Sequence, residues 1–97
     1  MEGLGQADKQ RSVLRIHLDI LNAVSDEGDA KPTHVLYKAN LSHERLVKYL
    51  DELTTKGLIE MKQDGEGRTY SLTPKGVSFL LELRRAESFV RGFGLAL

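Results

Sequence analysis

Apolar residues at helical spacing predict two helices in the first part of the chain. Between residues 9 and 26 they gather on one broad side of a helix, and Gly28 is placed to end it. A shorter helix is expected to start at Pro32 or Thr33, because proline and threonine are both favoured at helix starts. Residues 1–8 show no apolar period, so a flexible lead-in is expected there.

A third helix is predicted at residues 42–56. Asn40 suits the turn before it because asparagine tolerates left-handed backbone, and Ser42 is a favourable N-cap. Gly57 is placed to close the helix. The apolar stripe that faces the core repeats at intervals of three and four residues and consists of Leu46, Tyr49, Leu50 and Leu53.

The period then changes to the alternation that is typical of strands. Apolar and polar side chains alternate in residues 58–62 and again in residues 68–72, with a glycine-rich turn between the two runs. This pattern predicts a β-hairpin over residues 58–72. The apolar positions are Ile59 and Met61 in the first run, and Tyr70 and Leu72 in the second.

A last helix is expected to follow the hairpin. Thr73 can act as its N-cap, and Pro74 suits the first helical position. The helix is expected to run to about residue 91, because Gly92 and Gly94 disfavour its continuation. The fold class is therefore predicted to be mainly α with one small β-hairpin.

Composition narrows the possible classes of function. The chain has 97 residues with 14 basic and 14 acidic side chains, so any nucleic-acid binding has to come from a local basic patch. The lack of cysteine excludes a disulfide scaffold, a cysteine nucleophile and thiolate zinc sites. No uninterrupted apolar run is longer than three residues, so neither a membrane span nor a signal peptide is expected.

Three runs of residues give this order of elements a more specific meaning. They are Leu-Tyr-Lys-Ala-Asn-Leu-Ser at residues 36–42, Lys-Gly-Leu-Ile at residues 56–59, and Tyr-Ser-Leu-Thr-Pro-Lys-Gly at residues 70–76. Together they resemble the small archaeal winged helix-turn-helix DNA-binding proteins, some of which are associated with chromatin. The resemblance covers roughly residues 10–85, which is most of the chain.

The resemblance implies a winged-helix domain that binds duplex DNA and a helix after the wing that pairs with its copy in a second chain. On this basis we expect a lead-in at residues 1–8, a winged-helix domain at residues 9–73 and a C-terminal dimerisation helix at residues 74–97. The chain departs from the chromatin-associated members in its short tail and zero net charge. These departures favour a homodimeric transcriptional regulator, in the cytoplasm and associated with the nucleoid, over an architectural protein.

The predicted DNA contacts come from three segments. The recognition helix, residues 42–56, is expected to enter the major groove with its first turns nearest the bases, while the wing, residues 58–72, follows the backbone or the minor groove. Asp51 and Glu52 lie later in that helix and are expected to point away from the duplex. The candidate DNA-binding residues are Ser42, His43, Arg45 and Lys48 on the recognition helix, Lys62 and Arg68 on the wing, and His34 and Lys38 on the second helix.

The last helix carries two sets of apolar residues. Val77, Leu80 and Leu81 are expected to pack onto the winged-helix core. A second set alternates intervals of four and three like a heptad, which favours a homodimer; the alternative is that this set folds back onto the first helix of the same chain. The predicted dimer interface consists of Phe79, Leu83, Ala86, Val90, Phe93 and Leu97.

Other classes of function fit less well. His17, His34 and His43 lack metal-ligand spacing, and no phosphate-binding or nucleophile motif is present, so we expect no enzyme activity, no cofactor, no metal and no small-molecule ligand. Six Tyr and Phe residues, most at predicted core positions, leave no stacking platform for single-stranded nucleic acid. A winged helix that binds another protein instead of DNA stays open, because the second half of the recognition helix is acidic.

Overall fold

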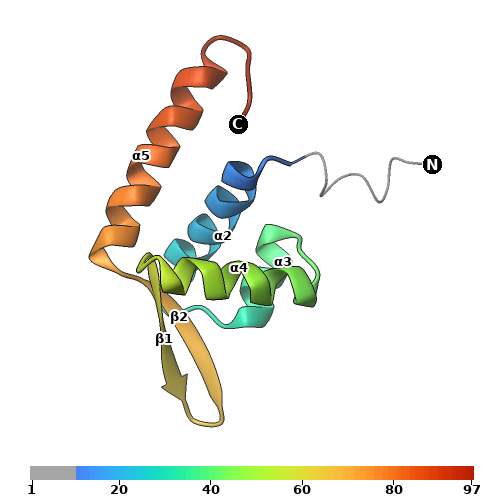
Figure 1. Cartoon of the computed structure of the whole chain (residues 1–97), viewed down its shortest axis with the longest axis vertical. Helices are drawn as coiled ribbons and strands as arrows, with labels where there is room; N and C mark the ends of the chain where they lie inside the picture. Colours follow the sequence, from blue (N-terminus) through green and yellow to red (C-terminus); the bar gives the residue numbers. More distant parts are fainter. Residues whose placement is uncertain (1–10) are drawn as a thin grey trace, which may run out of the picture.

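The computed structural model describes residues 11–97, and the lead-in predicted at residues 1–8 lies outside that range. Figure 1 shows a helical body from which a two-stranded hairpin projects at one end and helix α5 at the other. The mainly α fold and the order of elements confirm the prediction. The elements are α2 (Val13–Glu27), α3 (Pro32–Ala39), α4 (His43–Thr55), β1 (Ile59–Asp64), β2 (Gly67–Leu72) and α5 (Pro74–Arg91).

Polar side chains mark the starts of three helices. Ser12, Ser42 and Thr73 are N-caps, and the hydroxyl oxygen of each accepts a hydrogen bond from the backbone N–H three residues later. Helix α2 begins at Val13, after the predicted start at residue 9, because Ser12 takes the extended backbone of a cap, with φ −70° and ψ 162°. The predicted start of that helix was therefore too early.

A tight turn joins α3 to α4. Asn40 is left-handed, with φ 54° and ψ 56°, as predicted from the tolerance of asparagine for that region. The backbone N–H of Leu41 then donates to the carbonyl oxygen of Leu36 at 3.1 Å, which closes the end of α3. The recognition helix, α4, starts directly afterwards at its Ser42 cap.

The hairpin is antiparallel and extends further toward its tip than predicted. Ile59 pairs with Leu72 at the base, and Asp64 pairs with Gly67 at the tip. Met61 lies on the same face as Ile59 but beyond the core, and its side chain is exposed. Ala30, just before α3, exchanges two backbone hydrogen bonds with Tyr70, of 2.8 and 2.9 Å, so the start of α3 is fixed to the wing.

The core is built around α2. This helix packs against α3, β2 and α5, which explains why its apolar positions form such a broad side. Five of its side chains, those of Ile16, Leu18, Ile20, Leu21 and Val24, are at most 1% exposed. α4 contributes Leu46, Leu50 and Leu53 to the same core and leaves its opposite side exposed.

Helix α5 runs antiparallel to α2, because Arg84 contacts Asn22 while Arg15 contacts Glu87. Its inner side is made by Gly76, Leu80 and Leu83, all buried, and then by the partly buried Glu87. Leu80 packs on the core as predicted. The expectation for Val77 and Leu81 was wrong, since these side chains are 44% and 52% exposed.

Part of the predicted heptad stripe of α5 packs against its own chain. Leu83 is buried in the core, and Phe79 and Leu97 are partly buried against the core. Ala86 is exposed, and Val90 is partly buried. The stripe also does not continue, because α5 ends at Arg91, which leaves Phe93 and Leu97 beyond the helix.

A glycine turn produces this early end. Gly94 has φ +78°, and its N–H donates to the carbonyl oxygen of Arg91 at 2.9 Å. The N–H of Leu95 donates to the carbonyl oxygen of Val90 at 3.0 Å, which completes a Schellman motif. Figure 1 shows the last residues turning back beside α5.

Candidate nucleic-acid interface

The first two turns of α4 present polar side chains on the outer side of the helix. Ser42, His43 and Lys48 are exposed, and Arg45 is half-buried at the edge. Burial of Leu46 and Leu50 on the opposite side fixes the rotation of α4 and therefore the direction in which these residues point. Lys48 therefore points away from the core, and His43 lines a small hollow with Arg68 and Asp51.

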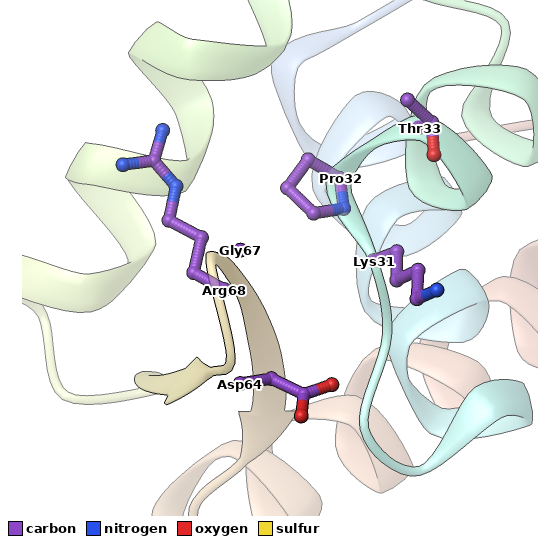
Figure 2. A pocket seen from close by; sticks show the side chains of 6 residues that line it. All are labelled: Lys31, Pro32, Thr33, Asp64, Gly67 and Arg68. Carbon is purple, nitrogen blue, oxygen red and sulfur yellow. The ribbon is translucent and has the colours of Figure 1, made fainter.

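Arg68 lies where α3, α4 and the wing meet. It lines a hollow of about 400 Å³ together with residues of the start of α3 and of the wing tip. In Figure 2 its guanidinium group points away from the Asp64 carboxylate and toward the neighbouring helix. The carboxylate therefore does not occupy the direction in which Arg68 reaches. The residues that line this hollow are Lys31, Pro32, Thr33, Asp64, Gly67 and Arg68.

Two further hollows connect Arg68 with α4. One, of about 60 Å³, is lined by Arg68, His43, Val47 and Asp51 among others. The other, of about 440 Å³, is lined by Arg68, Asp51, Thr54 and Thr55 together with residues of the wing. Asp51 therefore lies beside the wing at the same junction as Arg68.

Three of the candidate cations lie beside acidic side chains of the loop between α2 and α3 and the end of α2. His34 Nδ1 is 3.1 Å from Glu27 Oε1, and Lys38 Nζ is 3.3 Å from Glu27 Oε2. These two neighbours lower the pKa of Glu27, with the hydrogen bond to His34 as the larger cause. Lys62 Nζ is 3.6 Å from Asp29 Oδ1. Such exposed pairs are weak and exchangeable, but they reduce the positive potential at these three positions.

Lys48 and Arg68 differ from those three residues. Within residues 11–97 neither makes an ion pair or a hydrogen bond through its side chain, and both are exposed. His34, Lys38 and Lys62 therefore lie beside acidic side chains of the same chain, whereas Lys48 and Arg68 are available to an external anion.

The sequence did not identify Thr33 and Asp51 as parts of this junction. Both line hollows with Arg68, which is far from them along the chain. The β-bridge between Ala30 and Tyr70 brings these segments together. Because the bridge involves a single residue from each segment, it leaves no periodic pattern in the sequence. Only the three-dimensional fold shows the contact.

His17 lies beneath the recognition helix and not on its outer surface. Its ring contacts Tyr49 edge-on, with 5.5 Å between ring centroids, and its Nε2 atom has no hydrogen-bond partner within the described residues. Burial lowers the pKa of His17, and Glu52 Oε1 at 3.8 Å offsets this only in part. Burial between α2 and α4 therefore favours the neutral form of His17.

This burial predicts a pH dependence of stability. Because the folded chain lowers the pKa of His17, the unfolded chain binds a proton more readily, and protonation favours unfolding. The contribution of neutral His17 is complete above about pH 6.5 and declines as the pH falls below that value toward the pKa in the folded chain. We expect His17→Leu to flatten the fall in the free energy of unfolding between about pH 7 and about pH 5, measured by urea denaturation. If the free energy of unfolding falls equally in the variant and the wild type, groups other than His17 cause the fall.

None of the helices within residues 11–97 is both long enough and apolar enough to cross a membrane. The same residues contain no group of three or more His, Cys, Asp or Glu side chains arranged to hold a metal ion.

A short helix, a tight turn, a second helix and an adjoining hairpin define a winged helix-turn-helix domain. The family model for the winged helix-turn-helix matches residues 10–90, and the chain belongs to that family. No curated protein matches the chain by sequence.

Three solved structures show what the fold is similar to. Sso10a-2, a DNA-binding protein from Sulfolobus solfataricus, has a TM-score of 0.78 and 25% identity over 86% of this chain and 85% of its own. The MarR family transcription regulator SP03579 has a TM-score of 0.74 and 22% identity over 92% of this chain and 60% of its own. The oxidised form of MarR from E. coli has a TM-score of 0.67 and 19% identity over 71% of this chain and 51% of its own. The chain spans only about half to two thirds of these two MarR-type structures.

Proposed function

We propose that this protein binds duplex DNA, with the outer side of α4 in the major groove and the wing on the backbone or minor groove. The observation that carries the proposal is the meeting of Arg68 with α4 at the wing junction. Arg68 and Lys48 of α4 are both exposed, and neither is paired within residues 11–97. Helix N-terminal residues that enter the major groove contact base edges, and a wing arginine suits a narrow minor groove. The description of Sso10a-2 as a DNA-binding protein agrees with this assignment.

A regulator fits this surface better than a protein that coats DNA. Affinity for any sequence comes mainly from neutralised phosphates, and here Glu27 and Asp29 lie beside three of the candidate cations. Binding then depends on the few contacts of α4 and the wing, which favours selected sequences. SP03579 is described as a MarR family transcription regulator, and a cytoplasmic, nucleoid-associated and non-enzymatic role goes with this proposal.

The test is fluorescence anisotropy of the intact chain with a mixed-sequence duplex at several salt concentrations. We expect binding that weakens as salt rises, with a slope of about 0.9 per phosphate contact in a log–log plot. Selection from a random duplex library then identifies the preferred sequence. If neither the mixed duplex nor any selected duplex binds at low salt, the domain is better explained as a protein-interaction module, for which the acidic Asp51 and Glu52 on α4 are the favouring observation.

We also propose that the protein is a homodimer, joined through the outer side of α5. The predicted interface included Leu83, but the structure buries that residue in its own chain, so the proposed surface is moved to the exposed apolar residues of the same helix and its turn. Leu81, Phe89 and Phe93 are 52%, 68% and 71% exposed, and exposed apolar patches mark sites of contact between proteins. A two-fold partner would cover them and present a second α4 to the duplex.

Leu81→Glu combined with Phe89→Glu is expected to give a folded monomer. Both side chains are exposed in the single chain, so the charges disturb only the contact between chains. Light scattering should report the chain mass of 10.9 kDa in place of twice that value. Affinity for a duplex with two half-sites should fall about tenfold or more, because the two α4 helices no longer bind as one unit. Val13→Glu, at a 57% exposed position on α2, is the matched control, and a double variant that stays dimeric would contradict the interface.

A further inference from the structure

A row of alternating charges crosses the inner side of the molecule from α5 to α2. Arg15 of α2 makes an ion pair through its Nη1 atom with Glu87 of α5. The same guanidinium group contacts Oδ1 of Asp19 through Nε at 3.1 Å and Nη2 at 3.0 Å. Arg91 joins the row at its outer end, with its Nη2 atom 3.0 Å from Glu87.

The row continues from α2 to the turn before the recognition helix. Arg11 Nη1 donates to Oδ2 of Asp19 at 2.9 Å and to the carbonyl oxygen of Ala39 at 2.7 Å. Arg11 Nη2 donates to the carbonyl oxygen of Asn40 at 2.8 Å. Asp19 therefore shares its two oxygens between Arg15 on one side and Arg11 on the other.

The row of charges ends at the turn between α3 and α4, where a small shift would affect the recognition helix. The carbonyl groups at the end of α3 lack helical partners and carry the negative end of the helix dipole, so a guanidinium group is well suited to bind them. Asn40 is the left-handed residue that sets the angle between α3 and α4. Ser42, only two residues later, is the cap of α4, so a shift of this turn changes the direction of the recognition helix.

The central residues of the row are partly buried, so solvent screens the interactions between their charges only in part. The side chains of Arg11, Asp19 and Glu87 are 18% exposed, and that of Arg15 is 31% exposed. The hydrogen bond with Arg15 lowers the pKa of Glu87, and the same bond is the main cause that raises the pKa of Arg15. Charges in such a network depend on one another more than separate surface pairs do.

We propose that Glu87, Arg15, Asp19 and Arg11 form a relay that couples the seating of α5 on α2 to the turn that positions α4. The proposal rests on the proposed function, because it makes these four residues positioning residues for DNA binding without contact with DNA. The helix proposed to join two chains is then linked to the helix proposed to read the duplex. A change at Glu87 reaches the turn through two shared guanidinium groups and one shared carboxylate.

Glu87→Gln tests this relay at its far end. We expect the backbone amide signals of Asn40 and Leu41 to shift in NMR spectra and their hydrogen exchange to speed up, although Glu87 lies on another helix. Affinity for the selected duplex should fall about two- to tenfold, a range typical of coupling through networks of this kind. Glu87→Gln added to Arg11→Gln should weaken binding little further, because the relay is already broken.

Arg84→Gln is the matched control. It removes the 2.8 Å hydrogen bond between Arg84 Nε and Asn22 Oδ1, which also joins α5 to α2 but does not lead to the turn. A purely structural role of Glu87 would make the two variants alike. Equal effects of both variants on the Asn40 and Leu41 amides, or no effect of Glu87→Gln, would overturn the relay. If the wild-type chain binds no duplex, the proposed function fails, whereas the amide signals still decide whether the relay exists.

Discussion

Gly76→Ala is expected to remove a large part of the stability of the fold. A Cβ atom at this position would lie 1.9 Å from the carbonyl oxygen of Leu58 and 2.9 Å from its carbonyl carbon. Both contacts are to backbone, so no side chain can rotate to make room. Overpacking of this severity costs about 3 kcal/mol or more, a large part of the roughly 5–15 kcal/mol by which a domain is stable.

Hydrogen bonds around Gly76 prevent α5 from moving away from Leu58 to relieve this close contact. The Thr73 hydroxyl donates to the carbonyl oxygen of Gly57 at 2.6 Å and accepts from the Gly76 N–H at 3.0 Å. The N–H of Thr73 donates to the same Leu58 carbonyl oxygen at 3.1 Å. The start of α5 is therefore tied to the start of β1, and separating them would break a helix cap as well as the close contact.

Thermal unfolding followed by circular dichroism measures this effect. For a domain of this size, about 3 kcal/mol corresponds to a fall in Tm of roughly 12–24 °C. Gly67→Ala is the matched control, because its added Cβ would meet nothing closer than Asp64 O at 3.8 Å. A Gly76→Ala protein that melts within a few degrees of the wild type would show that α5 can leave β1 without cost.

Gly76 also shows why the faces of α5 could not be predicted from apolar spacing. The inner side of the helix starts at Gly76 and includes Glu87, neither of which counts as an apolar position. Gly76 lies on the inner side because its lack of a side chain permits the close contact with Leu58. Glu87 lies on the inner side because it pairs with Arg15. The apolar residues alone indicated the wrong stripe, since this helix buries one side and leaves large apolar side chains on another.

Local signals were more reliable than long-range ones. The caps at Ser42 and Thr73 and the left-handed Asn40 depend on a few neighbouring residues, and the structure has all three as predicted. The pairing of His34 and Lys38 with Glu27 depends on how α3 packs against the end of α2, which no local pattern records. The sequence could therefore identify the cations but not separate the paired from the unpaired ones.

The difference between paired and unpaired cations leads to the second prediction of a large effect, which concerns affinity for DNA. Lys48→Ala combined with Arg68→Ala is expected to weaken duplex binding about 100-fold at low salt. Each contact to a base edge or phosphate is worth roughly 1–3 kcal/mol, and the two residues sit on the two elements proposed to grip the duplex. Both side chains are exposed, so the folded state should be unaffected.

Lys38→Ala combined with Lys62→Ala is the matched control, because it removes the same number of positive charges. These two lysines lie beside Glu27 and Asp29, so their loss should weaken binding only about threefold, as expected for weak surface charges. Fluorescence anisotropy across a salt series compares the two double variants, and the first should also lower the log–log salt slope by about 2. If both variants weaken binding equally, net charge and not the junction of α4 with the wing governs affinity, and the proposed DNA-binding face would have to extend over α3 and the edge of the wing.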